Sequence, residues 1–319
     1  MSEDAAGDRL APGDAFAVLG NENRMAILRA LGESGGTLSF STLYDRVDVA
    51  DSSQFNYHLD RMVGHFVERT ADGYRLAGAG RRVVEAVLSG AVTERPTMER
   101  TPVDEACPYC GAPVAIEWQE DGVGVFCSEC AGRYSRERAA CGADDAGYLG
   151  RYPLPPAGVR GRDSEAVLGA AWTWANLEIL ALASGLCPRC SATVEWGATL
   201  CEDHDAGDGL CDACDGRYAL SARVACTNCI LETGGEPVVG LVAETELLAL
   251  LTGEGLNPVN PASVHRMEAV HGDYEETVLS REPLRARYTF AVGDERVSLT
   301  VDGDLSVVER RREAADAGH

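Results

Sequence analysis

The sequence contains no lysine, so all 28 of its basic residues are arginine, and they stand against 51 acidic residues for a formal net charge of −23. An acidic excess of this size without lysine suggests a halophilic protein, whose carboxylates hold water and cations while salt screens their mutual repulsion. A GC-rich genome would also account for the missing lysines. Both explanations are compatible with the composition.

Other features are missing as well. The first residues have neither the basic nor the apolar region of a signal peptide, so we expect a cytoplasmic protein. The longest apolar segment, 166–182, is interrupted by Thr173, Asn176 and Glu178, which favours a buried helix over a membrane span. No nucleophile motif, phosphate-binding loop or dinucleotide fingerprint occurs, so we expect no enzyme. The adjacent acids Glu275 and Glu276 are interpreted as the solvated face of a helix.

The N-terminal region has the spacing of several short helices. Apolar residues recur at helical intervals between Phe16 and Leu31, with a break at 20–21, which predicts two helices. A third helix is expected over 39–47. Asp51 is a good N-cap for a fourth, with His58 at the border of its buried face in a structural role. The buried face of this fourth helix is predicted to hold Phe55, Leu59, Met62 and Val63.

The opposite face of the fourth helix carries short polar side chains of the kind that a recognition helix presents to base edges and phosphates. Beyond it, "HFVERT" and "YRL" predict two strands joined at 71–73, which would form a wing. Helical spacing resumes over 81–92, as part of the core or of a dimer interface. The predicted DNA contacts are Ser52, Ser53, Gln54, Asn56, Tyr57 and Arg61 on the helix and Arg69 and Arg75 on the wing.

Three segments carry a family resemblance. "LGNENRMAILRAL", "SSQFNYHLDRM" and "VERTADGYRLAGAGRRVV" resemble the winged helix-turn-helix domain of ArsR-type transcription regulators, particularly the haloarchaeal ones, over Phe16 to Val92. The resemblance implies a winged helix that binds double-stranded DNA. The sensing cysteines of the metal-binding members are absent from 39–47, so metal sensing there is not implied. The alternative is a winged helix that serves as a protein–protein platform.

Acidity is concentrated outside this region. Residues 1–95 contain 10 arginines and 14 acidic residues, a net charge of −4. The remaining residues contain 18 arginines and 37 acidic residues, a net charge of −19. At molar salt the Debye length is about 3 Å, so distant carboxylates barely repel a phosphate while direct contacts survive. A polyanionic chain can therefore be expected to bind DNA through this domain.

Cysteines supply the second pattern. There are 12 of them, and in a reducing compartment they favour metal ligation over disulfides. Paired C-x-x-C turns are typical of closed four-thiolate zinc sites; iron is the main competitor, followed by disulfides. The four pairs are Cys107/Cys110, Cys127/Cys130, Cys187/Cys190 and Cys211/Cys214.

These pairs form an internal repeat. Cys107 and Cys187 are 80 residues apart, Cys127 and Cys211 are 84 apart, and "GRY" follows at the same offset of 84. Cys141 aligns with Cys226 at an offset of 85 residues and is interpreted as a thiol that binds no metal.

The second copy has four extra candidate ligands, Cys201, His204, Cys226 and Cys229. The first copy lacks both members of the Cys201/His204 pair and one member of the Cys226/Cys229 pair. We therefore expect these two pairs to share one ion, and the repeated pairs Cys187/Cys190 and Cys211/Cys214 to share another. This alternation resembles the cross-braced order of RING-type domains, and a zinc ribbon with a neighbouring clip is equally compatible. His204 is a ligand or a solvated loop histidine. We expect two zinc ions, and a third if the extra set binds.

The rest of the chain predicts further elements. A connecting helix over 163–185 would bury Leu168, Trp172, Ile179 and Leu180 in a core or a dimer interface. Helices over 244–251 and 262–270 and the strands "RARYTFAV", "RVSLTV" and "LSVVER" follow, and the strands form a β-meander. The C-x-x-C modules and this tail are also similar to the C-terminal regions of haloarchaeal regulators.

The predicted fold class is α+β and multidomain, with a winged helix, two zinc-ribbon-like modules and a β-meander. The predicted domains are 1–95 for DNA binding, 96–105 as linker, 106–160 and 187–235 as zinc modules, 161–186 as connecting helix, and 236–319 as the C-terminal helices and meander.

Together these patterns predict a sequence-specific transcription regulator that acts as a homodimer on double-stranded DNA, with no membrane partner. A zinc-stabilised C-terminal half would assemble it or receive a signal. The alternative is a basal factor resembling archaeal transcription factor E, which acts through contacts with RNA polymerase or other basal factors. A RING-like ligase adaptor is a third hypothesis and rests only on ligand order.

Overall fold

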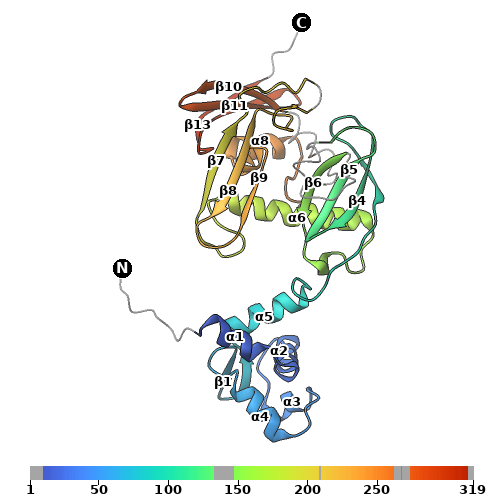
Figure 1. Cartoon of the computed structure of the whole chain (residues 1–319), viewed down its shortest axis with the longest axis vertical. Helices are drawn as coiled ribbons and strands as arrows, with labels where there is room; N and C mark the ends of the chain where they lie inside the picture. Colours follow the sequence, from blue (N-terminus) through green and yellow to red (C-terminus); the bar gives the residue numbers. More distant parts are fainter. Residues whose placement is uncertain (1–9, 133–146, 208–209, 262–266, 268–273, 315–319) are drawn as a thin grey trace. The chain divides into compact units, whose positions relative to one another are not determined.

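The computed structural model describes residues 10–132, 147–207, 210–261, 267 and 274–314. The chain divides into two compact units, Met1–Glu94 and Arg95–His319. The fold is α+β, as predicted: helices make up most of the first unit and antiparallel sheets most of the second (Figure 1).

Capping side chains determine where the helices of the N-terminal unit begin. Asn21, Ser39 and Asp51 each accept a hydrogen bond from the backbone N–H three residues later, which satisfies a donor that the helix cannot pair. The prediction that Asp51 caps the fourth helix is confirmed. The elements are α1 Pro12–Leu19, α2 Glu22–Ser34, α3 Phe40–Tyr44, α4 Ser52–Asp60, β1 Val67–Thr70, β2 Gly73–Leu76 and α5 Gly78–Leu88.

The buried face of α4 anchors it in the unit. The Phe55 ring lies edge-on to the rings of Phe40 and Tyr44, at centroid distances of 5.1 and 5.2 Å. Phe55, Leu59 and Met62 are all fully buried, as predicted, whereas Val63 is half-buried. His58 is buried beside them, with Nε2 3.3 Å from the Asn23 amide nitrogen, in the structural position expected of it.

The predicted hairpin is present as β1 and β2, and Gly73 allows its close packing. Gly73 has φ +139°, and a Cβ atom there would lie 2.1 Å from the carbonyl oxygen of Leu38, whose backbone pairs with Tyr74. The helix predicted over 81–92 instead spans 78–88, because Gly90 at φ +78° turns the chain out of the helix.

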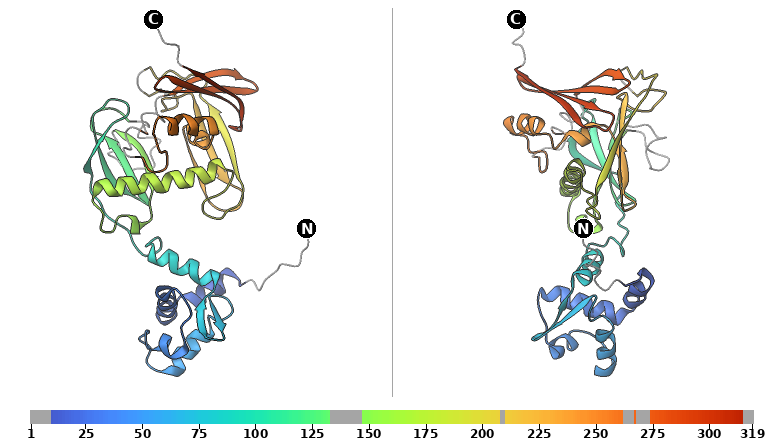
Figure 2. Two further views of the ribbon diagram at one scale, coloured as in Figure 1. Left: turned by 180° about the vertical axis from the view of Figure 1, so that it is seen from behind. Right: turned by 90° about the vertical axis from the view of Figure 1, so that its left-hand side faces the viewer.

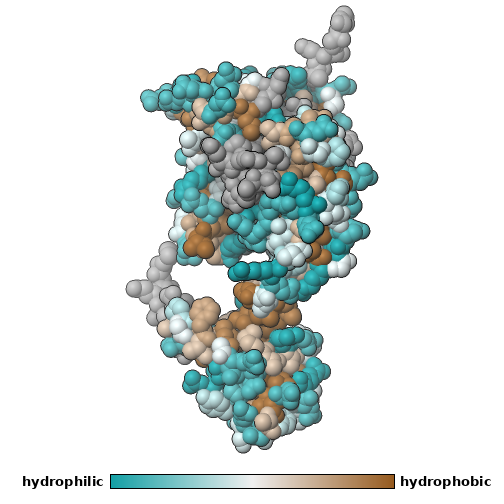
Figure 3. Space-filling model, turned by 45° about the vertical axis from the view of Figure 1, so that its right-hand side comes forward, coloured by the Kyte–Doolittle hydropathy of each residue, from teal (hydrophilic) through white to brown (hydrophobic). Residues whose placement is uncertain are grey.

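Besides Tyr57, three large hydrophobic side chains are exposed among the described residues of the N-terminal unit. Phe16 is 74% exposed, Leu88 44% and Val92 70%. In Figure 3 hydrophobic surface gathers on the upper part of this unit, at the height of α5 in Figure 1. A monomeric unit would leave this surface in water.

The first sheet of the C-terminal unit has the order β3-β4-β5-β6, and all of its neighbouring strands are antiparallel. The predicted linker over 96–105 is wrong in part, because β3 occupies its second half. Val103 is buried in this strand and pairs with Val114, and Pro102 is tolerated because β3 is an edge strand. The strands are β3 Thr101–Ala106, β4 Pro113–Gln119, β5 Gly122–Cys127 and β6 Tyr148–Pro153, followed by a short 3-10 turn, η1 Pro156–Gly158.

Helix α6, Ser164–Ala183, joins the two halves of the C-terminal unit. Asp163 caps it by accepting from the Ala166 N–H. Leu168 packs under the first sheet, Trp172 enters the core below the meander, and Leu182 reaches the second sheet. Figures 1 and 2 show α6 running past both sheets. By length and composition alone α6 could cross a membrane, yet one of its faces is buried inside the unit.

The second sheet has the order β7-β8-β9, and a four-stranded meander, β10-β11-β12-β13, follows two short helices. Helix α8 packs against β11 and β12. The helix predicted over 262–270 lies outside the described residues except for buried Met267. The elements are β7 Val194–Leu200, β8 Leu220–Cys226, β9 Glu232–Gly235, α7 Val238–Leu241, α8 Thr245–Gly253, β10 Tyr274–Arg281, β11 Leu284–Val292, β12 Glu295–Asp302 and β13 Val307–Ala314.

The meander corrects one prediction. Glu275 and Glu276 lie on β10, not on a helix, because Tyr274, Glu276 and Val278 alternate inward with the period of two of a strand. Glu276 accepts hydrogen bonds from the backbone N–H groups of Ala219 and Leu220 and from the hydroxyl of Tyr288. Burial raises the pKa of Glu276 above its ordinary value despite these donors.

The substitution Phe55→Ala tests how α4 is anchored. It should lower the free energy of unfolding of the N-terminal unit by about 3–5 kcal/mol, because it leaves a cavity among Phe40, Tyr44 and Leu59. Far-ultraviolet circular dichroism would follow the helices of this unit.

All four tryptophans lie in the C-terminal unit, so tryptophan fluorescence should keep the wild-type transition in this variant. Tyr57→Ala, on the exposed face of the same helix, is the matched control and should change stability by no more than about 0.5 kcal/mol. A shift of both signals together in Phe55→Ala would contradict the division into two units.

Candidate metal centres

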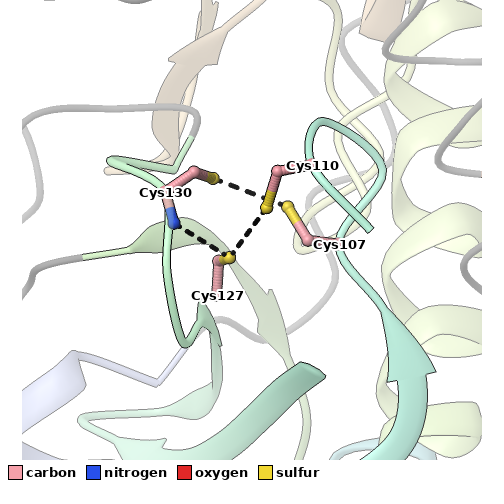
Figure 4. A group of neighbouring side chains, drawn as sticks. All are labelled: Cys107, Cys110, Cys127 and Cys130. Carbon is pink, nitrogen blue, oxygen red and sulfur yellow. Dashed lines mark hydrogen bonds between the residues drawn. The ribbon is translucent and has the colours of Figure 1, made fainter. Parts of the chain in front are cut away.

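The first centre lies at the end of the β4–β5 hairpin. Cys107 and Cys110 precede β4, and Cys127 and Cys130 close β5. Because Val114 pairs with Cys127 in the ladder, the two C-x-x-C turns are brought to the same end. The Sγ atoms of Cys107 and Cys130 are 3.6 Å apart and those of Cys110 and Cys127 are 3.5 Å apart, and Figure 4 shows the four sulfurs facing one another.

These distances fit one tetrahedral ion. Four sulfurs at about 2.3 Å from a zinc ion would lie about 3.8 Å from each other, close to what is seen. A disulfide needs sulfurs about 2.05 Å apart, so the four thiols are not cross-linked. The residues present therefore fit a closed four-thiolate site.

Backbone N–H groups support the sulfurs of this centre. The N–H groups of Glu129 and Cys130 both donate to the Cys127 sulfur at 3.3 Å, and Gly132 donates to Cys130 at 3.4 Å. Such donors favour the thiolate, the form that binds a metal. Burial acts in the opposite direction and raises the pKa of the Cys107 thiol.

The second centre is built in the same way from Cys187, Cys190, Cys226 and Cys229. The Sγ atoms of Cys187 and Cys229 are 3.6 Å apart, and those of Cys190 and Cys226 are 3.5 Å apart. The backbone N–H of Ala192 lowers the pKa of Cys190 to about 6. This centre also fits a single ion held by four thiolates.

The third centre consists of Cys201, His204, Cys211 and Cys214, whose ligand atoms lie within 4.8 Å of one another. His204 Nδ1 is 3.3 Å from the Cys214 sulfur, and Nε2 lies 3.2 Å from the carbonyl oxygen of Arg217. That carbonyl holds the Nε2 proton and leaves Nδ1 free as the ligand, the usual arrangement for a metal-bound histidine. The Asp205 N–H lowers the pKa of Cys211 to about 7.

The predicted pairing of ligands in the second copy is wrong. Cys226 and Cys229 join Cys187 and Cys190, not Cys201 and His204, and Cys211 and Cys214 join the Cys201/His204 pair. The order is therefore not cross-braced. It is compatible with a ribbon and a neighbouring clip, the alternative that the sequence left open.

Strand register explains this error. Val194 pairs with Cys226 as Val114 pairs with Cys127, so the structural counterpart of Cys127 is Cys226 and not Cys211. Residues 201–219, which carry the third centre, are an insertion between β7 and β8. The "GRY" sequence at 216–218 follows the inserted pair Cys211/Cys214, just as the first "GRY" follows Cys127/Cys130. Alignment on this sequence therefore matched Cys211 with Cys127, against the strand register. Cys141 lies outside the described residues.

The predicted DNA contacts form a separate candidate site in the N-terminal unit. Tyr57 is 57% exposed on α4, opposite the buried Phe55. Asn56 donates to the carboxylate of Asp60 at 2.9 Å, and Arg75 forms an ion pair with Glu68 at 2.6 Å. All eight predicted residues are exposed: Ser52, Ser53, Gln54, Asn56, Tyr57, Arg61, Arg69 and Arg75.

Two family models match the chain, and the matched regions contain the metal centres and the predicted DNA contacts. A family model described as "Domain of unknown function (DUF7351)" matches residues 104–307. The chain belongs to the DUF7351 family. A second model, "Domain of unknown function (DUF7347)", matches residues 12–87. No curated protein and no solved structure matches the chain.

The DUF7351 region contains all three metal centres, and the DUF7347 match contains the exposed face of α4. Sequence analysis missed Arg217 and Tyr109 in the DUF7351 region. The Arg217 guanidinium lies 3.9 Å from the centre of the Tyr109 ring. The repeated "GRY" was the signal that could have drawn attention to Arg217.

We expect the DUF7351 region to carry three zinc ions when the chain is purified without chelator. Elemental analysis per chain measures this directly. Cys187→Ser and Cys226→Ser should each lower the content by the same ion, because both residues belong to the second centre. Cys141→Ser should keep three ions.

Cadmium-113 NMR distinguishes the two possible assignments of ligands to ions in the second copy. Cys226→Ser should remove a signal of a four-sulfur site and leave the signal of the three-sulfur, one-nitrogen site unchanged. Loss of the nitrogen-containing site in Cys226→Ser would show that the ligand sets are assigned wrongly.

Proposed function

We propose that the chain is a sequence-specific DNA-binding transcription regulator, with a winged helix-turn-helix over 12–88 and a zinc-stabilised C-terminal half. The observation that carries the proposal is α4, a helix held by Phe55, Leu59 and Met62 whose polar opposite face is exposed to solvent. A helix so anchored can enter a major groove without unfolding.

The neighbouring elements support this proposal. Helix α3 and the turn over 45–51 precede α4, and the β1–β2 hairpin follows it, in the order of a winged helix. In this arrangement Gln54 and Asn56 would reach base edges, Arg61 a phosphate, and the hairpin arginines the flanking backbone. Arg75 would exchange its ion pair with Glu68 for a phosphate, and Asn56 would leave Asp60.

The C-terminal half would serve structure rather than catalysis. Each centre has four protein ligands, so a bound zinc ion would have no open position for water. Zinc would stabilise folding there by binding thiolates that burial alone could not organise. The sites could hold these ions for assembly or for a signal, without an enzymatic step.

Dimerisation accounts for the exposed apolar surface of the N-terminal unit. Phe16, Leu88 and Val92 are exposed near both ends of the unit's sequence, and a second copy would remove them from water. Two copies would also present two α4 helices to successive half-sites, which raises affinity without new base contacts.

Tyr57→Ala and Arg61→Ala should each weaken binding to the operator about ten- to a hundredfold, since a specific contact is worth about 1–3 kcal/mol. Binding sites would be identified by genome-wide mapping of bound DNA and affinities measured at high salt. Arg82→Ala, an exposed arginine on α5, is the matched control and should bind like the wild type. If the chain instead copurifies with RNA polymerase and gives no discrete sites, the basal-factor alternative is correct.

The proposal also predicts an unusually shallow dependence of operator affinity on salt. Only Arg61, Arg69 and Arg75 are proposed to contact phosphates, and the N-terminal region has a net acidic charge, so few counterions would be released on binding. Binding would then depend on base contacts, fit and dimerisation. Fluorescence anisotropy between dilute and molar KCl measures the slope, and a steep loss of affinity would contradict this account.

A further inference from the structure

The inserted segment 201–219 is attached to the first centre through one arginine. Arg217 Nε and Nη2 donate to the carbonyl oxygen of Gly132 at 3.2 and 3.0 Å, and the guanidinium covers the Tyr109 ring at 3.9 Å. Tyr109 lies between Cys107 and Cys110, and Gly132 follows Cys130. Arg217 therefore contacts both C-x-x-C turns of the first centre.

The same segment is attached to the meander on its other side. The N–H groups of Ala219 and Leu220 donate to Glu276 at 2.6 and 3.3 Å, and the Arg281 guanidinium donates to the carbonyl oxygen of Glu202 at 3.3 Å. The segment thus lies where the first sheet, the second sheet and the meander meet.

The third centre positions Arg217 from one side along the chain, and the stacking of Tyr218 on Tyr274 positions it from the other. The Arg217 carbonyl accepts from His204, and Cys214 precedes it by three residues, so two of the four ligands fix this stretch of backbone. Among its described residues, 201–219 contains no helix or strand, and Cys211 is its only buried residue. Tyr218 and Ala219 pack against the core beside the meander, and the rest of the described segment, with so little apolar burial, would depend on an ion to stay folded.

The third centre should also be the easiest of the three to open. One ligand of each of the other two centres, Cys127 or Cys226, lies in a paired strand, whereas no described residue of 201–219 belongs to a strand. Regions with few buried contacts open locally at the lowest free energy. The segment carries six acidic residues and one arginine, so it attracts cations from solution.

We propose that Cys201, His204, Cys211 and Cys214 form an exchangeable site for a divalent transition metal such as zinc, and that its occupancy locks Arg217 onto the first centre. With the ion bound, Arg217 holds both C-x-x-C turns of the first ribbon. Without it, the segment loosens and Arg217 leaves Tyr109 and Gly132. This inference does not depend on DNA binding.

The test uses the zinc-loaded full-length chain and a chelator titration. Elemental analysis counts the ions that remain, and a parallel titration of cobalt-substituted protein shows by its absorption which ligand set empties first. Hydrogen exchange monitored by mass spectrometry follows the amides of 107–112. The first ion lost should be that of the three-sulfur, one-nitrogen site, and exchange over 107–112 should then rise roughly tenfold, the factor for an interaction of about 1.4 kcal/mol. Adding zinc back should restore protection.

Two variants isolate the role of Arg217. Arg217→Ala should retain three zinc ions yet show the faster exchange over 107–112 even when zinc is bound. Arg223→Ala removes an exposed arginine of β8 that pairs with Glu232 and should behave like the wild type. The proposal is overturned if all three ions leave together, if a four-thiolate site empties first, or if exchange over 107–112 is the same with and without the third ion.

Discussion

Coordination of one ion by four thiolates would do in the two C-x-x-C hairpins what apolar burial does elsewhere in this protein. At the cysteine end of the second hairpin the buried cluster is small and consists of Leu182, Cys187, Val194 and Val224, whereas Leu220 and Ala222, further along, pack into the core beside the meander. An ion held between the two C-x-x-C turns would fix the cysteine ends of β7 and β8. Helix α6 spans from one ribbon to the other, so its own burial also depends on both hairpins keeping their shape.

Local signals in the sequence were enough to predict the N-terminal unit. Asp51 caps α4 because a carboxylate at the N-cap reaches the N–H three residues later, which has no partner within the helix, whatever surrounds it. The helical period placed Phe55 and Leu59 inside and Tyr57 outside without reference to other elements. The end of α5 was missed because the apolar spacing continues past Gly90, while the backbone turns there.

Contacts between distant residues could not be predicted in the same way. Which pairs of cysteines share an ion is set by strand register, and a sequence offset cannot distinguish an inserted loop from a repeated one. Glu276 looked like a surface acid because nothing near it in the sequence reveals its partners, the N–H groups of Ala219 and Leu220 some 57 and 56 residues away. The strand β3 was hidden by the polar residues and proline of an edge strand.

One further consequence concerns how such a chain can evolve. Leu200 and Leu220 are direct partners in the ladder, so residues 201–219 leave and rejoin the hairpin at adjacent points. The first ribbon crosses the same gap with only Glu120 and Asp121 between β4 and β5. The ribbon hairpin is thus a scaffold that accepts a grafted module at its tip, and new ligand chemistry can be acquired there at little entropic penalty to the parent domain.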